Sequence, residues 1–485
     1  MMDLENELRQ LHRSLKERQD RFAHLLEYVH PDQHLSAVNL LHYLCIRELD
    51  LSVLQENLHR AGLSTLLNSE GYIESQLKAV YNLLTKNTNG EVPAPDYQTS
   101  RQLLDRRTEY LFGKRKEDQV PAIMVTFKSS FAHDFITVKK LLKAGMNIAR
   151  INCAHDDEKT WLQMIKTVRE VSMFTGIPCK VYMDLAGPKM RTVIGGKNKR
   201  IEVEEEDIIL LTDKLDKKSK IPVVGCTIPD VAGKLKQGDR VIFDDGLIES
   251  RVVEVKAHGA ELEITQVASK KPYLKSEKGI NLPDAEFHLS ALSDFDRKCI
   301  PFIMEHADLL GYSFIHTQAD LRVLYELLQP KKIPVILKIE TPTAFREFPD
   351  LLFTAMREAC YGVMIARGDL AVELGFENIS GAQDAIFEIC RAAHVPVIFA
   401  TQILENMNKK GLPTRAEITD ASYGMRADCL MLNKGVHTAK VIAILKKILY
   451  KKANQLNKNY PVYRPLRMAK QFFERREKES IVSSQ

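Results

Sequence analysis

The chain has 485 residues, enough for two to four domains, and its 45% hydrophobic and 27% charged content is that of an ordinary globular protein. Its 69 Lys and Arg face 64 Asp and Glu, a formal net charge of +5, which favours neither a nucleic-acid partner nor a membrane surface. No apolar run approaches the roughly 18 residues of a spanning helix. The N-terminus lacks the pattern of a secretory signal, and the eight scattered cysteines form no CxxC pair. We therefore expect a cytoplasmic protein with free thiols and without nucleic-acid or membrane partners.

The first part of the chain predicts helices. Residues 1–86 carry apolar residues at helical spacing, as in Leu4, Leu8, Leu11 and Leu15, and indicate a small helical domain. Residues 87–119 contain glycine and prolines and predict a linker. The basic stretches at 106–116 and 464–476 are expected to face solvent.

From residue 121 onward, short apolar runs alternate with amphipathic stretches. Eight such runs are typical of a TIM (β/α)8 barrel, an α/β fold, built from residues 120–191 and 289–450. Residues 451–485 are then a C-terminal tail. The predicted strands are residues 122–127, 147–152, 180–184, 309–315, 335–340, 362–366, 397–401 and 429–432.

One interval between the third and fourth predicted strands breaks this rhythm. Residues 192–288 alternate with period two, in runs such as 200–204, 240–244 and 251–255, and turn signals such as Gly238-Asp239 separate them. We expect a small β domain inserted in a loop on the catalytic face of the barrel, where it is a candidate lid.

Polar residues follow the apolar strands at the points where the strands end. Because the carboxyl ends of parallel strands meet at one face of a barrel, we expect these side chains to lie together. A single such residue most often caps a helix or a loop, but that explanation does not fit the whole set. The set is Arg150 and Asn152 after the second strand, Asp184 after the third, Ser313 near the fourth, Lys338 and Glu340 at the fifth, Asp369 after the sixth, and Thr401 and Gln402 after the seventh.

The chemistry of this set is constrained by its charges. Glu340 and Asp369 offer hard oxygen ligands for Mg²⁺ or Mn²⁺ and leave positions open for substrate oxygens. Lys338 and Arg150 add positive charge beside them. The cluster suits a carboxylate substrate that forms an enolate, a phosphoryl group in transfer, or both. No Walker-type phosphate loop is present.

Several motifs together resemble the pyruvate kinase family. Its central motifs are similar to Lys338-Ile339-Glu340, to Arg367-Gly368-Asp369 and to the Thr401-Gln402 pair, in this order. Residues 144–152 and 183–191 resemble its second and third strands, and residues 244–248 and 278–283 its mobile β domain. The resemblance covers roughly residues 120–450 and includes the domain insertion at the same barrel loop.

The resemblance implies a reaction and a role for each residue. Phosphoenolpyruvate and ADP would give pyruvate and ATP, with Mg²⁺ or Mn²⁺ as cofactor. We also expect a homo-oligomer. The implied roles are metal binding for Glu340 and Asp369, carboxylate binding for Gly368 and Asp369, catalysis for Lys338, Arg150 and Thr401 (the last beside the substrate carbon), nucleotide binding for Arg150, His155 and Arg191, and a monovalent-cation region at Asn152, Asp184 and Lys189.

The chain departs from the family in ways that bear on its cofactors. Potassium-dependent members carry Ser, Thr and Glu where this chain has Ala154, Leu185 and Lys189. The pattern resembles that of potassium-independent members. The physical explanation is that the Lys189 ammonium replaces the charge of the potassium ion. We therefore expect no K⁺ requirement.

Other departures leave two alternatives open. The loops after the first and eighth strands, residues 126–130 and 433–436, differ from the family pattern near the nucleotide contacts. We expect the protein to lack the family's C-terminal regulatory domain and to carry the N-terminal helical domain as an addition. The chain could be a metal-dependent lyase or aldolase that acts through a pyruvate enolate. It could also be a pseudo-enzyme that binds phosphoenolpyruvate.

Overall fold

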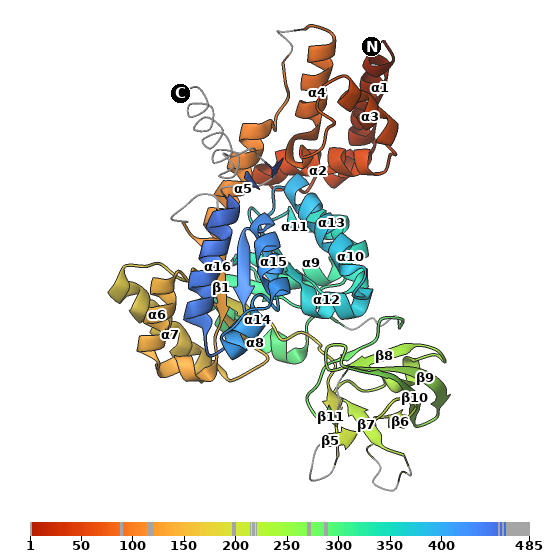
Figure 1. Ribbon diagram of the computed structural model, residues 1–485, viewed down its shortest axis with the longest axis vertical. Helices are drawn as coiled ribbons and strands as arrows, with labels where there is room; N and C mark the ends of the chain where they lie inside the picture. Colours follow the sequence, from red (N-terminus) through yellow and green to blue (C-terminus); the bar gives the residue numbers. More distant parts are fainter. Residues whose placement is uncertain are drawn as a thin grey trace, which may run out of the picture.

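The structure, a computed structural model, describes most of the chain. The described residues are 2–87, 91–114, 120–195, 200–213, 215, 219, 221–268, 273–285, 290–330, 332–453, 456–457 and 460–461. The basic stretch at 464–476 therefore lies outside the described residues, as does most of the expected tail. A helical part, a barrel and a β domain follow one another along the long axis of the molecule (Figure 1).

The N-terminal part is helical, as predicted. The buried face of its first helix is formed by Leu4, Leu8, Leu11 and Leu15, the residues whose spacing predicts the helix. The helices are α1 (Met2–Arg21), α2 (His34–Arg47), α3 (Ser52–Arg60) and α4 (Ile73–Leu84).

The segment expected as a linker contains a further helix, α5 (Tyr97–Phe112), capped by the Asp96 side chain, which accepts a hydrogen bond from the Thr99 amide. The linker prediction does not describe these residues, because the prolines that suggested it lie just before the helix. The expectation that the basic stretch here faces solvent is wrong for Arg107, which is 3% exposed. Its guanidinium donates to the carbonyl oxygens of Ala393 and His394 and so joins α5 to the barrel.

The predicted barrel is present, with eight parallel strands in a closed ring of order β1-β17-β16-β15-β14-β13-β3-β2. All eight strands occur where the apolar runs predicted them. They are β1 (Ala122–Thr126), β2 (Ile148–Asn152), β3 (Lys180–Asp184), β13 (Leu309–Tyr312), β14 (Val335–Ile339), β15 (Gly362–Ala366), β16 (Val397–Ala400) and β17 (Cys429–Leu432).

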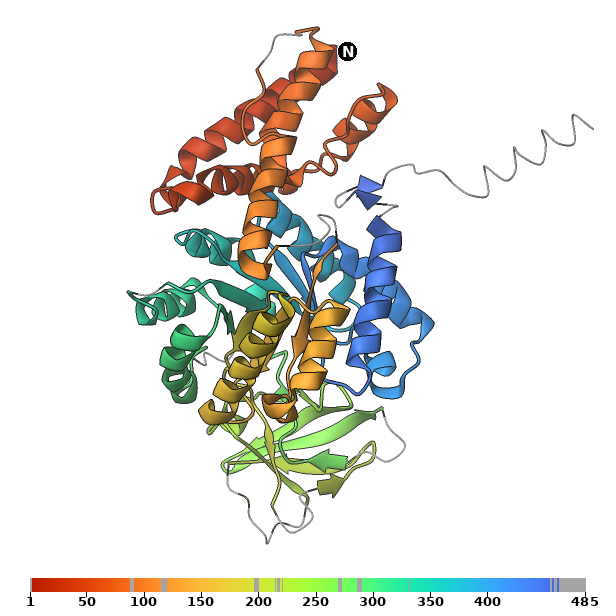
Figure 2. The same ribbon diagram turned by 90° about the vertical axis from the view of Figure 1, so that its left-hand side faces the viewer.

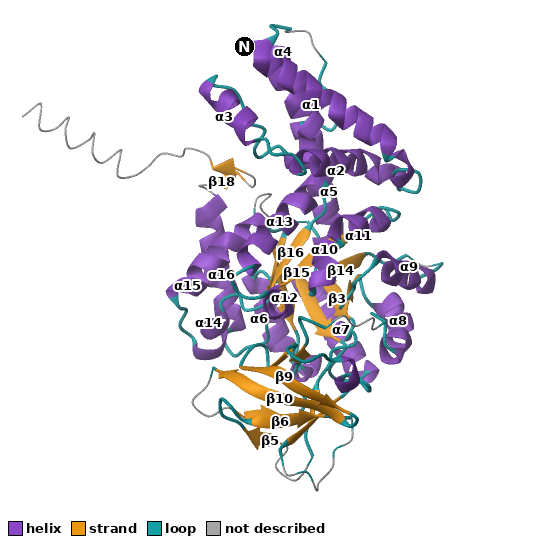
Figure 3. Cartoon of the chain, turned by 90° about the vertical axis from the view of Figure 1, so that its right-hand side faces the viewer, coloured by secondary structure: helices purple, strands orange, loops and turns teal. Residues whose placement is uncertain are grey.

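Helices surround the ring, and the figures show them around the strands on all sides (Figures 1 and 3). They are α6 (Phe135–Ala144), α7 (Glu158–Thr175), α8 (Asp294–His306), α9 (Gln318–Leu327), α10 (Pro342–Arg346), α11 (Phe348–Ala355), α12 (Arg367–Leu374), α13 (Ile379–Ala392), α14 (Glu405–Lys410), α15 (Arg415–Tyr423) and α16 (Thr438–Ala453). No described helix has the length and apolarity needed to span a membrane.

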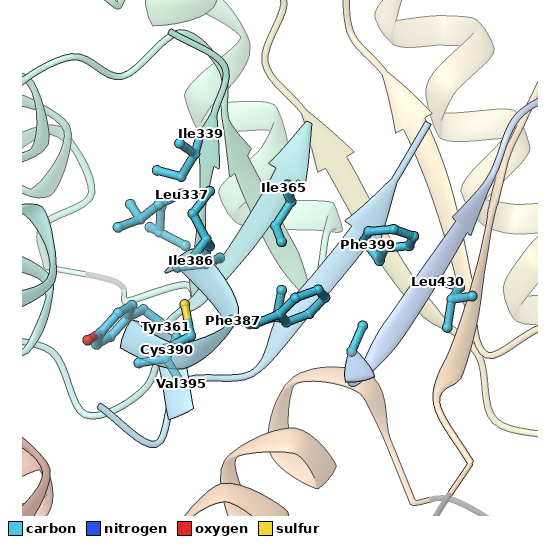
Figure 4. Close-up of a cluster of buried hydrophobic side chains, with 14 of the residues drawn as sticks. Leu337, Ile339, Tyr361, Ile365, Ile386, Phe387, Cys390, Val395, Phe399 and Leu430 are labelled. Carbon is cyan, nitrogen blue, oxygen red and sulfur yellow. The ribbon is translucent and has the colours of Figure 1, made fainter. Parts of the chain in front are cut away.

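Two apolar layers hold the barrel together. In the outer layer, Phe387 of α13 packs on Phe399 of β16 with ring centroids 5.9 Å apart, among the side chains drawn in Figure 4. In the inner layer, residues from the strands form one cluster with Leu111 and Phe112 from the last turn of α5. The end of α5 therefore fills the barrel interior from the side where the strands begin.

The interval with period-two alternation forms a β domain with its own core, inserted between β3 and α8. It lies at the opposite end of the barrel from the N-terminal helices (Figure 2). Its main sheet has the order β12-β8-β9-β10-β6-β7-β4, and β11 pairs with β5. The strands are β4 (Thr192–Val193), β5 (Arg200–Glu202), β6 (Ile208–Leu211), β7 (Val223–Cys226), β8 (Arg240–Phe243), β9 (Ile248–Lys256), β10 (Gly259–Val267), β11 (Tyr273–Lys275) and β12 (Ile280–Asn281).

Two short strands follow α16, namely β18 (Leu456–Asn457) and β19 (Tyr460–Pro461), which pair with each other. The eight cysteines are free, as expected.

Candidate active site

A cavity of about 700 Å³ opens at the carboxyl ends of the barrel strands, where the inserted domain joins the barrel. Most of the site residues predicted from the sequence line it. They are Arg150, Asn152, His155, Lys189, Arg191, Ser313, Lys338, Glu340, Asp369 and Thr401. Asp184 lies beneath them and is fully buried.

Asp184 is the centre of a buried ionic network. Its Oδ2 accepts from Arg150 Nε at 3.0 Å and lies 3.4 Å from Lys338 Nζ. Burial by itself would raise the pKa of Asp184, but Lys338 and Arg150 outweigh it and lower the pKa below its usual value. The Tyr182 hydroxyl donates to Asp184 Oδ1 at 3.0 Å. Asp184 therefore stays ionised although it is excluded from water.

Gly311 on β13 makes this arrangement possible. A Cβ at this position would lie 1.9 Å from the Tyr182 hydroxyl and 2.4 Å from Asp184 Oδ1. Only glycine leaves room for the pair, because neither group can move without breaking the network.

Lys338 presents a fixed positive charge to the cavity. Its ammonium lies 3.0 Å from Glu340 Oε1 and donates to Ser313 Oγ at 2.7 Å. Burial lowers the pKa of Lys338, but Asp184 and Glu340 outweigh this and raise the pKa above its ordinary value. Lys338 is therefore protonated at any physiological pH.

Glu340 and Asp369 form a pair of carboxylates that favours a cation. Burial, and further the nearby charge of Asp369, raise the pKa of Glu340 above its ordinary value despite Lys338. Glu340 Oε2 accepts from the Phe314 amide at 2.7 Å. A divalent cation between the two carboxylates would make it easier to keep both of them ionised. Their oxygens are the donors that Mg²⁺ and Mn²⁺ prefer. The residues present therefore fit such a metal.

The part of the chain that the structure describes offers no group of three or more His, Cys, Asp or Glu side chains that could enclose a metal ion. Two carboxylates with open positions are the arrangement expected of a metal that also binds substrate oxygens.

Thr401 stands in a strained turn at the end of β16. Its φ is 67°, in the left-handed region that a β-branched residue rarely adopts, and Gln402 follows with a φ of 57°. The Thr401 hydroxyl oxygen is buried and has no hydrogen-bond partner within the described residues. A Cβ placed on Gly368 would lie 3.6 Å from that oxygen, so Gly368 and Thr401 are neighbours.

The sequence did not indicate what holds this turn. Arg367 Nε donates to the carbonyl oxygen of Ala400 at 2.9 Å, and its Nη2 donates to that of Thr401. The guanidinium carbon lies 3.9 Å from the centroid of the Phe399 ring, and Asp420 pairs with the same guanidinium. In the sequence, Arg367 stands out only because it precedes Gly368 and Asp369 in the family motif. The sequence predicts no role for it.

Lys189, expected in a monovalent-cation region with Asn152 and Asp184, lines the same cavity as Asn152, and its ammonium lies 2.7 Å from Asp369 Oδ1. Asp369 raises the pKa of Lys189 although burial opposes it. The Asn152 side chain accepts from the amide of Ala154 at 3.0 Å and shapes the local turn. The fixed cation therefore neutralises a candidate metal ligand.

The end of the cavity near β1, β2 and β17 is basic. Arg191 donates to the Glu277 carbonyl at 3.1 Å, and the cavity lining also includes Lys128 and Lys434. Burial, Lys434 and Arg191 lower the pKa of His155, so the imidazole is neutral at pH 7. Lys434 belongs to the loop that departs from the family pattern, and the sequence alone predicts no role for it.

Comparisons with known proteins identify the family of the chain. The profile of the pyruvate kinase barrel domain matches residues 122–458. The human pyruvate kinase PKLR is 34% identical over 311 residues, which cover 61% of this chain and 53% of that protein. Pyruvate kinases of Thermococcus litoralis and Thermotoga maritima are 34% and 31% identical over 322 and 321 residues, covering 64% of this chain in each case and 65% and 66% of those proteins. The chain thus spans about half to two thirds of the length of these relatives. The chain belongs to the pyruvate kinase family.

Proposed function

We propose that the protein transfers the phosphoryl group of phosphoenolpyruvate to ADP, giving pyruvate and ATP. The observation that carries the proposal is the meeting of Lys338, Glu340, Asp369 and Thr401 at one cavity of a pyruvate kinase barrel. A lyase that cleaves a carbon–carbon bond would need no phosphoryl-stabilising cations, whereas this cavity holds Arg150, Arg191 and Lys338 together.

Each residue has a separate role in the proposed reaction. The bond from phosphorus to the enol oxygen breaks, a bond to an oxygen of the ADP β-phosphate forms, and the enolate that remains takes a proton at its methylene carbon. The Lys338 ammonium stabilises the phosphoryl group and the enolate oxygen as charge develops there. Thr401 lies beside the methylene carbon, and Arg150 holds the phosphoryl end. The backbone at Gly368 and Asp369 receives the substrate carboxylate.

Glu340 and Asp369 would hold Mg²⁺ or Mn²⁺. When bound, the metal supplies charge that draws the substrate oxygens together and stabilises the transferring group. The pKa of Glu340 is raised, which means that ionising this buried carboxyl costs free energy. A bound cation would lower that cost, and this supports the assignment.

Potassium independence is part of the proposal. Lys189, 2.7 Å from Asp369, places a covalently attached cation in the cavity. The substrates bring several negative charges, which this ammonium helps to balance without an ion from solution.

The nucleotide phosphates would lie at the basic end, against Arg191 and beside His155. Lys434 and Lys128 lie at the same end and support the assignment, because they add positive charge where the family motif is altered.

A coupled lactate dehydrogenase assay on the purified full-length protein tests the reaction. With millimolar Mg²⁺, phosphoenolpyruvate and ADP should give pyruvate at equal rates with and without K⁺. Absence of turnover with every nucleoside diphosphate would refute the proposal. Cleavage of oxaloacetate without nucleotide would favour the lyase, and metal-dependent phosphoenolpyruvate binding without ADP binding would favour a pseudo-enzyme.

A further inference from the structure

The inserted domain contacts helix α12 through a hydrogen bond that the reaction does not use. Asn281 Nδ2, on β12, donates to Glu373 Oε1 on α12 at 2.7 Å. Asn281 is 4% exposed, so this contact is shielded from solvent. Both residues line a second cavity, of about 710 Å³, between the inserted domain and the barrel. Burial raises the pKa of Glu373 to about 7, consistent with withdrawal of the carboxyl from water.

Two more contacts meet α12 and the turn after it. At the start of the helix, Lys189, in the segment that leads from β3 into the inserted domain, pairs with Asp369. Just beyond the end, the turn between β8 and β9 approaches Phe376, because a Cβ on Gly246 would lie 3.3 Å from its ring. Gly246 has a φ of 91°, so the tight turn favours glycine, and its approach to Phe376 leaves little room for a side chain. The inserted domain and the segment that leads into it therefore contact α12 near both of its ends.

The position of Glu373 links this docking to the reaction. Glu373 lies four residues after Asp369 on one helix, so the two side chains are on the same face. A shift of the inserted domain that pulls on Glu373 moves the whole short helix, and with it Gly368 and Asp369.

We propose that Glu373 is a positioning residue: through Asn281 it fastens the inserted domain to α12 and thereby sets where Gly368 and Asp369 stand in the active site. The expected effect of Glu373 on turnover rests on the proposed function. The contact between the inserted domain and α12 does not. Glu373 acts through the helix and touches no substrate.

The test uses Glu373→Ala and Asn281→Ala in the full-length protein, singly and together, with Glu373→Gln as the conservative variant. Glu377→Ala is the matched control, because this exposed side chain lies just past α12 and accepts a 3.5 Å hydrogen bond from its neighbour Asn378. Amide hydrogen exchange of residues 240–250 and 278–282 is followed at pH 8 without substrate, and kcat and KM are measured alongside.

We expect each Ala variant to speed exchange of those amides by about tenfold, the loss typical of one hydrogen bond to a charged group, and the double variant to add little. kcat should fall and KM for phosphoenolpyruvate should rise. Glu373→Gln, which keeps an acceptor oxygen, should behave like the wild type, as should Glu377→Ala.

Unchanged exchange in both single variants would overturn the proposal, as would fully additive effects in the double variant. A faster exchange in an enzyme without turnover supports the fastening and refutes only the reaction proposed above. Should Glu373→Ala not fold, Asn281→Ala removes the same bond from the other side and decides alone.

Discussion

The Arg367 guanidinium donates a hydrogen bond to the backbone carbonyl oxygen of Thr401, and in this way one strand-end segment fixes the strained turn of the next. A non-glycine residue in the left-handed region costs about 1–3 kcal/mol and persists only where its surroundings hold it. Arg367 supplies that restraint with a flat group that serves two carbonyl oxygens and a carboxylate together.

Replacing Arg367 by lysine should therefore lower kcat by about tenfold or more, since an ammonium cannot reproduce the planar fork. The coupled assay measures the effect, and Arg346→Lys, at an exposed position, is the control. Wild-type kcat in Arg367→Lys would show that the turn needs no such restraint.

Thr401→Val should separate stability from catalysis. The Thr401 hydroxyl oxygen has no partner within the described structure, so its removal breaks no hydrogen bond, and the melting temperature should change by only about 2 °C or less. Proton exchange at the methyl group of pyruvate, followed by NMR in D₂O, should slow by about a hundredfold. Thr419→Val, on the exposed face of α15, controls for the substitution. Rapid exchange in Thr401→Val would remove Thr401 from the proton step.

Lys338→Met should slow phosphoryl transfer severely while Mn²⁺ still binds. Loss of a fixed cation at the transferring group costs about 10²–10³ in kcat. Asp184 and Glu340 also lose a buried partner, so we expect the free energy of unfolding to fall by about 3 kcal/mol.

Mn²⁺ binding by electron paramagnetic resonance is the readout of the intact metal site in this variant. Lys332→Met is the control, because this exposed lysine precedes the same strand and pairs with Glu358. Substantial turnover in Lys338→Met would contradict its assigned role.

Lys189→Ala should reduce activity by about tenfold or more, because charges about 4 Å apart near a protein surface attract by about 4 kcal/mol. Methylammonium in the assay should restore part of the loss by filling the vacated space with a small cation. Lys236→Ala, elsewhere on the inserted domain, should have no effect. Full activity of Lys189→Ala without added cation would refute the proposed replacement of potassium.

Stability should fall as the pH is lowered, in part through His394. Burial lowers the pKa of His394 from 6.5 to about 3, with Arg107 adding to the shift. Between pH 6.5 and about 3, the unfolded chain binds a proton at this ring while the folded protein keeps the ring neutral. The free energy of unfolding is therefore unaffected by His394 above pH 6.5 and decreases as the pH falls toward 3. Each unit below 6.5 costs about 1.4 kcal/mol.

Urea unfolding at pH 7.5 and 5.5 measures this loss. His394→Asn is the comparison, since asparagine tolerates the φ of 51° at this position and does not titrate. Equal pH dependence in the two proteins would assign the effect to other groups.

The barrel strands could be predicted closely because buried parallel strands are short apolar runs with clear ends. β3, β15 and β17 begin and end at the predicted residues, whereas β13 stops at Tyr312 because Phe314 adopts a φ of 53°. The gathering of Lys338, Glu340 and Asp369 followed from the parallel direction of the strands.

Other features depend on docking between distant segments, which leaves no periodic signal. Lys189 and Asp369 are 180 residues apart in the chain, and their contact depends on how the segment leading into the inserted domain lies over the barrel. The bond between Asn281 and Glu373 has the same origin. Helix α5 escaped prediction because its buried side is narrow and includes Arg107 and Thr108, polar residues that bond to the barrel.

Leu111 and Phe112 also constrain the order in which the molecule assembles. The helix that carries them precedes every barrel strand in the chain, yet its end stands inside the closed ring. Side chains packed at crystal-like density leave little room for a helix end to enter a completed ring. Because synthesis delivers the N-terminal segments first, α5 is already available when β17, the last barrel strand, closes the ring by pairing with β1.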